Sequence, residues 1–415
     1  MQLHENEEIR QRALLVAVDT GEYDAEASMA ELYELAKTAG AQVVSDIIQK
    51  RDAVKTATCV GSGCLEQIDE FCKANEIDLL IFDRELTPTQ IRNIEEKTGV
   101  RVVDRTMLIL DIFAQRARSK EGKLQVELAQ LQYMLPRLSG RGTALSRLGG
   151  GIGTRGPGET KLETDRRHIR ARMEKIKERL KDSECHREQL KKRRKKTGVI
   201  TVAIVGYTNA GKSTLMNYLT DAGVLAQDKL FATLDPTSRA LKLKNGVSVM
   251  LIDTVGLVRR LPHHLVEAFK STLEEAAQAD IILNVCDASS EEAALHLEVT
   301  QKLLESLGCH GSPIIPVLNK CDMLTGLDSI PMIGKAVRIS AKTGYGVDKL
   351  LDAIEENLPV RMIQGKWLLP FDKVGIAAEI RRDGNLISEE YTAEGLEIEA
   401  VVEDRLFCEL KSYEI

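Results

Sequence analysis

Two stretches of the chain alternate short apolar runs with amphipathic segments, the pattern expected of parallel strands connected by helices. In the first stretch, residues 13–104, we expect strands at 13–19, 56–60, 79–83 and 100–104. In the second stretch, residues 198–360, we expect strands at 199–206, 281–287, 313–319 and 336–340, and a hairpin over 239–253. Asn245-Gly246 is a typical turn dipeptide for such a hairpin. The sequence therefore predicts two α/β domains, each with a parallel sheet covered by helices.

Between these stretches the apolar positions follow helical spacing. We expect one helix over 106–135, ended by Pro136, and a second over 161–196. Each carries a 4-3-4 apolar stripe, formed by Leu124, Leu128, Leu131 and Leu135 in the first helix and by Ile169, Met173, Ile176 and Leu180 in the second. Because each stripe can bury the other, the pair predicts a long antiparallel helical hairpin. The glycine-rich residues 139–160 would form the loop at its tip.

The C-terminal residues carry short strand-like runs at 375–380, 396–402 and 406–413, which predict a small β-rich α+β domain. The predicted order is thus an N-terminal α/β domain over 1–105, the helical hairpin over 106–197, a second α/β domain over 198–360 and the small domain over 361–415.

Composition narrows the class of protein. No stretch approaches the ~20 apolar residues that a membrane span needs, and the polar start lacks the layout of a signal peptide. The 8 scattered cysteines contain no CxxC pair and are expected to be reduced thiols. The net charge is −6, yet residues 161–197 contain 16 lysines and arginines against 7 acidic residues. This asymmetry favours a polyanionic partner that contacts one part of the chain.

The most specific chemical motif is a GxxxxGK[ST] phosphate loop placed between a predicted strand and a predicted helix. It consists of Gly206, Tyr207, Thr208, Asn209, Ala210, Gly211, Lys212 and Ser213, with Thr214 following. In such a loop the backbone N–H groups face the phosphates of a nucleotide. Lys212 would contact the terminal phosphates, and the Ser213 hydroxyl would bind Mg²⁺.

Two further motifs predict that the base is guanine. They follow predicted strands and consist of Asn319, Lys320, Cys321 and Asp322, and of Ser340, Ala341 and Lys342. The Asp322 carboxylate can accept hydrogen bonds from guanine N1–H and the N2 amino group, whereas adenine offers no such donor pair. Asn319 and Lys320 would brace the loop and cover the ring.

Two loops are expected to complete the magnesium and γ-phosphate site. They contain Asp253, Thr254, Val255 and Gly256, and Phe231, Ala232, Thr233, Leu234 and Asp235. Asp253 would hold Mg²⁺ through water, Thr233 would complete the shell of the ion, and Gly256 would sense the γ-phosphate. We expect Lys212, Thr233 and Gly256 to be the catalytic residues of GTP hydrolysis.

These motifs together resemble the translation-factor class of GTPases, related to the Obg group. The segment GIGTRGPGETKLETDRR at 151–167 resembles the HflX family in particular. The resemblance implies a GTPase domain, with a mixed, mainly parallel sheet and helices on both faces, over 198–360. It also implies a monomer that binds the large ribosomal subunit and its rRNA through residues 139–197. Ribosome splitting or rescue under stress, or ribosome biogenesis, would be its role.

Leu257 stands directly after Gly256, where many GTPases have a glutamine that orients the attacking water. We therefore expect slow intrinsic hydrolysis that a partner accelerates. Arg259 and Arg260 could approach the phosphates, but we interpret them as ordinary surface arginines.

The alternative function is that of an RNA-binding or RNA-remodelling protein. In it the N-terminal domain would act on RNA, with or without an ATP site of its own, and GTP would regulate that activity. Gly61-Ser62-Gly63 could hold a phosphate there, although a plain tight turn is the simpler interpretation. We expect a cytoplasmic protein, with peripheral contact to a membrane as the alternative location.

Overall fold

The computed structural model of the 415-residue chain describes residues 11–138, 157–196, 199–220, 231, 237–260, 278–306, 309, 311–324, 335–359 and 362–415. The chain forms two compact units. The first comprises Met1–Glu188, Asp228–Asp235 and Val258–Lys270, and the second comprises Gln189–Gln227, Pro236–Leu257 and Ser271–Ile415. The units are therefore not simple halves, because two short segments from the middle of the chain belong to the first unit.

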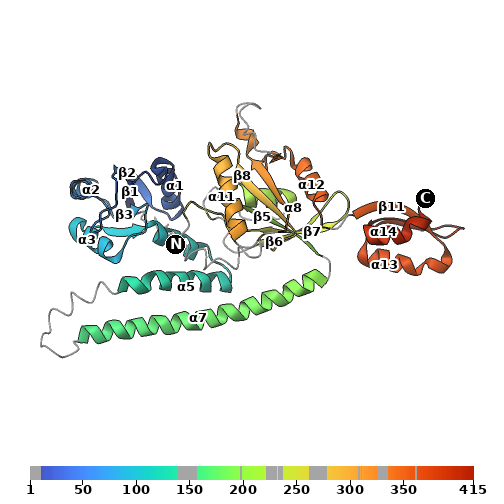
Figure 1. Cartoon of the computed structure of the whole chain (residues 1–415), viewed down its shortest axis with the longest axis horizontal. Coiled ribbons are helices and arrows are strands. Elements are labelled where there is room, and N and C mark those ends of the chain that lie inside the picture. The colour runs from blue at the N-terminus through green and yellow to red at the C-terminus, as the bar shows by residue number, and fades with distance from the viewer. Residues whose placement is uncertain are drawn as a thin grey trace, which may run out of the picture. The chain divides into compact units, whose positions relative to one another are not determined.

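The first unit contains a parallel four-stranded sheet of order β2-β1-β3-β4, with its helices in the connections (Figure 1). Its strands are β1 (Arg12–Asp19), β2 (Gln42–Lys50), β3 (Leu79–Phe82) and β4 (Arg101–Asp104). The connecting helices are α1 (Ala25–Thr38), α2 (Ser62–Ala74) and α3 (Pro88–Thr98), and α4 (Arg105–Arg116) follows β4. Because the order reverses between β1 and β3, the carboxyl ends of these two strands flank a topological switch point.

The predicted strand at 56–60 is wrong, and the true second strand, β2, was missed. Residues 55–59 form a tight turn in which Lys55 and Cys59 pair, and Cys59 has a left-handed φ of 66°. A strand cannot contain that conformation. Strand β2 lies at the sheet edge and has Ser45 and Asp46 in its middle, so its apolar run is interrupted. An edge strand is only half-buried, and its pattern is correspondingly weak.

The predicted helix at 106–135 is two helices, α4 and α5 (Lys120–Arg137). Ala117 has an extended backbone, and the Ser119 side chain caps α5 by accepting a hydrogen bond from the Gly122 N–H at 2.8 Å. A short polar side chain at this position starts a new helix. Pro136 lies inside the last turn of α5 rather than ending it.

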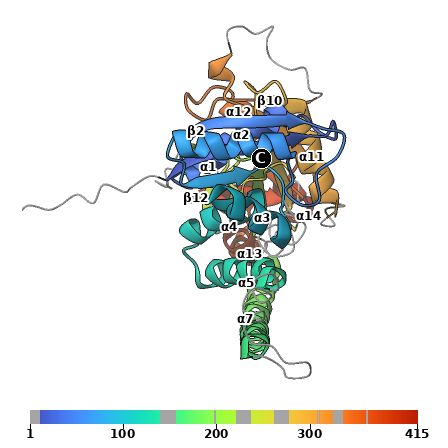
Figure 2. The same ribbon diagram turned by 90° about the vertical axis from the view of Figure 1, so that its left-hand side faces the viewer.

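The helical hairpin is confirmed by α5 and the 40-residue α7 (Pro157–Lys196), which lie side by side in both overall views (Figures 1 and 2). The two predicted stripes meet in one apolar cluster centred on Leu128, Met173 and Ile176. The remaining stripe residues, Leu124, Leu131, Leu135, Ile169 and Leu180, pack around that centre.

The second unit contains a six-stranded sheet of order β10-β9-β8-β5-β7-β6, parallel except for the β6–β7 hairpin. The strands are β5 (Ile200–Gly206), β6 (Thr237–Lys242), β7 (Ser248–Asp253), β8 (Ile281–Asp287), β9 (Ile314–Asn319) and β10 (Val337–Arg338). The helices described in this part are α8 (Lys212–Thr220), α11 (Ala293–Ser306) and α12 (Val347–Glu356). All predicted strands of this domain are present, so the mixed, mainly parallel α/β fold is confirmed.

The C-terminal part of the second unit is an α+β domain around the buried Trp367. Its antiparallel sheet has the order β11-β13-β12, formed by β11 (Met362–Leu369), β12 (Asn385–Tyr391) and β13 (Leu396–Glu403). Its helices are α13 (Gly375–Asp383) and α14 (Asp404–Leu410). The strand predicted at 396–402 is correct, whereas those at 375–380 and 406–413 are wrong because these segments are mainly helical. Apolar runs this short do not distinguish a strand from a buried helix face.

Candidate nucleotide-binding site

The phosphate loop connects β5 to α8, and its glycines are required by close backbone contacts. A Cβ on Gly206, whose φ is 147°, would lie 1.9 Å from the carbonyl oxygen of Val285. Gly211 has φ 86°, and its Cβ would lie 2.3 Å from Nδ2 of Asn319. Asn209 also adopts a left-handed φ of 60°. The loop therefore curls tightly against β8 and the carboxyl end of β9, which is the shape that turns backbone N–H groups toward an anion.

Lys212 is the first residue of α8 and is buried. Its Nζ donates hydrogen bonds to the carbonyl oxygens of Gly206, at 3.1 Å, and Tyr207, at 2.8 Å. Burial disfavours the charged ammonium and lowers the pKa of Lys212 to about 8, although the nearby Asp253 carboxylate acts in the opposite direction. The side chain thus lies under the phosphate loop as a desolvated cation that an anionic ligand would stabilise.

Ser213 and Asp253 bring together two oxygen donors from different elements. The Ser213 hydroxyl donates to Oδ2 of Asp253 at 2.8 Å, and Asp253 is the fully buried last residue of β7. A hydroxyl and a carboxylate are hard oxygen ligands suited to Mg²⁺. Among the residues described, no cluster of three or more histidine, cysteine or acidic side chains could hold a metal ion. The donor pair itself fits Mg²⁺, an ion that usually keeps several waters and binds through few protein oxygens together with phosphates.

The DTVG segment folds directly over the phosphate loop. The Leu257 N–H donates to the Gly206 oxygen at 3.1 Å, and the Thr208 N–H donates to the Leu257 oxygen at 2.8 Å. A Cβ on Gly256 would lie 2.7 Å from Cγ2 of Thr208 and 3.1 Å from Nζ of Lys212. Thr254 anchors the segment by donating its hydroxyl to the Ile204 oxygen at 2.8 Å. Any larger residue at 256 would collide with the loop that it covers.

The side chain of Leu257 is buried in a small apolar cluster with Tyr207 and Leu303. Tyr207 also stacks on His296 of α11, with ring centroids 4.0 Å apart. His296 was not predicted from the sequence, and its position in an otherwise ordinary amphipathic helix gives no local indication of this contact.

The two motifs predicted to recognise the base lie together at the carboxyl ends of β9 and β10. Asn319 is buried and connects two loops, donating through Nδ2 to the Ala210 oxygen at 2.8 Å and accepting from the Ala341 N–H at 2.9 Å. Asp322 is exposed, and its Oδ1 accepts a hydrogen bond of 2.6 Å from the Ser340 hydroxyl. The carboxylate is thereby oriented by a neighbour while remaining open to a ligand.

Lys320 has a left-handed φ of 63°, and its Nζ pairs with Oδ2 of Asp287 at 2.8 Å. Asp287 was missed, although its place at the carboxyl end of β8 could have identified it. The Cys321 thiol donates a hydrogen bond to the Leu318 carbonyl oxygen at 3.4 Å, and burial raises the pKa of this thiol. Lys342 is exposed beside the turn at Ser340.

Three groups of residues predicted from the sequence do not lie at this site in the structure. Ala232, Thr233, Leu234 and Asp235 lie outside the described residues. Phe231 belongs to the first unit, where its ring packs edge-on against Phe113 of α4 at 4.6 Å. Gly61 is the N-cap of α2, and its N–H donates to Oε1 of Gln49 at 2.8 Å, as in an ordinary turn.

Comparison with known proteins follows the same order along the chain. The family model described as GTP-binding GTPase N-terminal matches residues 26–114, the GTP-binding GTPase middle region matches 116–194, and the 50S ribosome-binding GTPase matches 201–320. A GTPase HflX of Caldanaerobacter subterraneus subsp. tengcongensis is 50% identical over 97% of this chain and 92% of its own. The chain belongs to the HflX GTPase family. Members from Lacrimispora saccharolytica and Escherichia coli are 48% and 44% identical, covering 99% and 90% of this chain and 97% and 87% of theirs.

As a member of the HflX family, the protein binds GTP and hydrolyses it, and both the resemblance and the predicted enzyme class are confirmed. In the part of the chain that the structure describes, no helix combines the length and apolar character needed to cross a membrane.

Proposed function

We propose that this GTPase acts on the large ribosomal subunit, and that Lys212, Ser213, Asp253, Gly256, Asn319 and Asp322 carry nucleotide recognition and hydrolysis. Lys212 would neutralise the terminal phosphates, and Asp322 would select guanine. Ser213 and Asp253 would hold Mg²⁺, which supplies charge neutralisation at the β- and γ-phosphates when bound. Thr233 is proposed as a further ligand of the ion on its motif alone. The Asn319 bridge between the phosphate loop and the base-side loop supports one continuous nucleotide site.

The contrast between the buried apolar face and the exposed basic face of α7 supports the proposal of a ribosomal partner. Met173 and Ile176 are buried against α5, whereas Arg170, Lys175 and Arg179 are exposed. The hairpin therefore buries an apolar seam and presents cations outward. Phosphate backbones are the natural partners of such a surface, because binding them releases condensed counterions. We place the rRNA contact in residues 139–197, and the matching family model that is described as 50S ribosome-binding agrees with a large-subunit partner.

The proposed functional division of the chain is 1–105, 106–197, 198–360 and 361–415. The three separate sheets and the successive family matches support it. We further propose a cytoplasmic monomer that acts in ribosome splitting, rescue or biogenesis. The Gly61 turn gives no support to a separate ATP-dependent activity of the N-terminal domain, because its N–H already donates to Gln49.

The test measures GTP hydrolysis and sedimentation with purified large subunits at two salt concentrations. We expect subunits to stimulate hydrolysis, and both binding and stimulation to weaken steeply with salt. The double variant Lys175→Glu/Arg179→Glu should bind at least about tenfold more weakly, whereas Lys349→Glu, an exposed change on α12, should bind normally. Binding that neither salt nor the double variant changes would refute the hairpin as the rRNA contact.

A further inference from the structure

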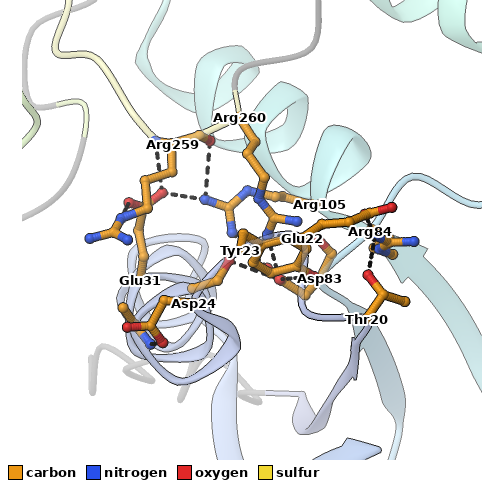
Figure 3. Close-up of polar contacts among 12 residues, drawn as sticks. Thr20, Glu22, Tyr23, Asp24, Glu31, Asp83, Arg84, Arg105, Arg259 and Arg260 are labelled. Carbon is orange, nitrogen blue, oxygen red and sulfur yellow. Dashed lines mark hydrogen bonds and ion pairs between the residues drawn. The ribbon is translucent and has the colours of Figure 1, made fainter. Parts of the chain in front are cut away.

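The switch point of the first sheet contains a compact cluster of polar side chains (Figure 3). Asp83 directly follows β3 and is fully buried. The loop after β1 brings Tyr23 to it, and Ser28 reaches it from the first turn of α1. Ser28 donates its hydroxyl to Oδ2 of Asp83 at 2.8 Å, and the Tyr23 hydroxyl donates to the same oxygen at 3.3 Å. The crevice outside the carboxyl ends of strands at a switch point is where open α/β sheets bind ligands.

At this switch point lies the guanidinium group of Arg260, which belongs to the same compact unit. Its Nη2 donates to Oδ2 of Asp83 at 2.5 Å and also to the Ser28 hydroxyl. The guanidinium carbon lies 3.7 Å from the centroid of the Tyr23 ring. A carboxylate beside an aromatic face suits a planar, delocalised cation better than a compact ammonium. Arg260 is exposed, as expected of a surface arginine, but it is not an ordinary one because its guanidinium pairs with the buried Asp83.

Two hydrogen bonds hold the backbone of Arg259, the residue before Arg260. Glu31 accepts a hydrogen bond from the Arg259 N–H at 3.2 Å, and Arg105 donates to the Arg259 carbonyl oxygen at 3.3 Å. Arg105 also pairs with Asp83, at 2.7 Å, and with Glu31. Two further guanidinium groups balance the charge of these buried or nearly buried carboxylates. Arg259 pairs through Nε with Oε2 of Glu31 at 3.6 Å, and Arg260 pairs with Asp83.

The conformation of Arg260 indicates that these contacts hold the segment firmly. Its φ is 46°, in the left-handed region that a non-glycine residue seldom adopts. Such a conformation persists where surrounding interactions maintain it. The hydrogen bonds and the ring contact of the side chain are the interactions that can do so here.

We propose that Tyr23, Ser28 and Asp83 form a guanidinium-binding socket, and that its ligand is Arg260 of the same chain. Arg260 follows Gly256 by four residues, a distance of at most about 14 Å of extended chain. Occupation of the socket therefore restrains the segment that follows the γ-phosphate-sensing glycine. This consequence rests on the proposed role of Gly256, whereas the socket itself does not. GTP, by repositioning Gly256, shifts the equilibrium toward release of Arg260.

Limited digestion with trypsin tests the socket, because trypsin must itself bind the guanidinium to cleave after Arg260. The rate of cleavage after Arg260 is measured by mass spectrometry in nucleotide-free, full-length protein, relative to cleavage after the exposed Lys342. We expect Tyr23→Ala/Ser28→Ala to raise this relative rate at least about tenfold. Tyr23→Phe keeps the aromatic face and should change it by less than about threefold. Glu22→Gln, which removes the charge that pairs with Arg84 but leaves Tyr23, Ser28 and Asp83 unchanged, is the matched control.

An unchanged rate in the double variant, with an unchanged circular dichroism spectrum, overturns the socket. If that variant unfolds, Arg260→Ala provides a second test, because Asp83 keeps Arg105 as its partner there. The vacated socket should bind Nα-acetyl-L-argininamide at least about tenfold more tightly than the wild-type protein does, measured by NMR titration. Nα-acetyl-L-lysinamide should show no such difference. Equal affinity of argininamide for both proteins would overturn the socket.

The link to nucleotide is tested separately by repeating the digestion of the wild-type protein with GDP and with a non-hydrolysable GTP analogue. Faster cleavage after Arg260 with the analogue supports the link. Equal rates, with both nucleotides shown to be bound, overturn the link and leave the socket intact. Failure to bind either nucleotide would contradict the proposed nucleotide site rather than the socket.

Discussion

In the second unit, β5 ends in a glycine loop that precedes a buried lysine, whereas in the first unit β1 and β3 end beside Tyr23 and Asp83. Both regions lie at the carboxyl ends of parallel strands. The glycine loop offers backbone N–H groups and the Lys212 cation, which suit an anion. The first region offers a buried carboxylate and an aromatic face, which suit a cation.

The difference shows that the backbone architecture supplies a place for a ligand, whereas side-chain charge decides which ligand can occupy it. The same contrast is found at the two ends of the short segment from Gly256 to Arg260. Only three residues lie between Gly256, which covers the proposed anion site, and Arg260, which occupies the proposed cation site. Removal of a positive charge should therefore weaken ligand binding in the second unit, whereas removal of a negative charge should weaken it in the first.

The largest effect is expected from Lys212→Ala, which removes the only buried lysine among the described residues. Loss of charge-assisted contacts to the terminal phosphates should weaken GTP binding about 1,000-fold and abolish measurable hydrolysis. Fluorescent-nucleotide titration measures the affinity. Lys244→Ala is the control, because Lys244 is exposed and pairs with Asp352 on α12. GTP affinity within about tenfold of wild type would show that the anion site does not depend on this lysine.

Asp322→Asn tests base selection and should weaken GTP binding about 100-fold. The amide retains the shape of the side chain, but its NH₂ group faces the guanine donors and one acceptor is lost. Xanthosine triphosphate, which has a carbonyl in place of the N2 amino group, should bind the variant better than GTP does. Competition titration with both nucleotides measures this exchange. A variant that still prefers GTP would remove Asp322 from the base site.

Sequence reasoning works best on motifs of contiguous residues at the end of a strand. The phosphate loop and the DTVG segment are local motifs, and the observed packing of Gly206 and Gly256 explains why they contain glycine. The socket could not be predicted in this way, because Ser28, Asp83 and Arg260 are separated by 55 and 177 positions. Their charges become informative only when the fold brings them together.

The secondary-structure errors have a similar origin. Residues 375–380 and 406–413 are short apolar runs that suit either a strand or a helix packed on a sheet, and the tertiary contacts around Trp367 decide the outcome. Strand β2 was missed because an edge strand needs fewer apolar residues than a central one. The hairpin was predictable because its 4-3-4 stripe extends over several turns.

The pH dependence of GTP binding gives a smaller effect with a defined sign. Burial lowers the pKa of Lys212 from 10.5 to about 8, so the free side chain is mainly charged at pH 7 and mainly neutral at pH 8.5. Bound phosphates favour the ammonium form, so binding at pH 8.5 must take up a proton. Affinity should therefore fall about fourfold between pH 7 and pH 8.5. Calorimetry in buffers of different ionisation enthalpy measures the proton uptake, and Lys212→Arg should show almost none. An affinity that rises over this interval would contradict the assignment.

The smallest effect is expected from Leu257→Gln, which places the usual water-orienting side chain after the DTVG glycine. Leu257 is buried with Tyr207 and Leu303, and its backbone pairs with Gly206 and Thr208 on the phosphate loop. A glutamine there would have to leave this apolar contact before it could reach a water molecule, so intrinsic hydrolysis should stay within about twofold of wild type. The free energy of unfolding should fall by about 1 kcal/mol, because a polar amide replaces a buried aliphatic group. Single-turnover hydrolysis and urea unfolding measure the two quantities. An increase in hydrolysis of tenfold or more would mean that residue 257 is released toward the γ-phosphate when GTP binds. Leu257 would then belong functionally to the nucleotide site rather than to the packing between the phosphate loop and α11.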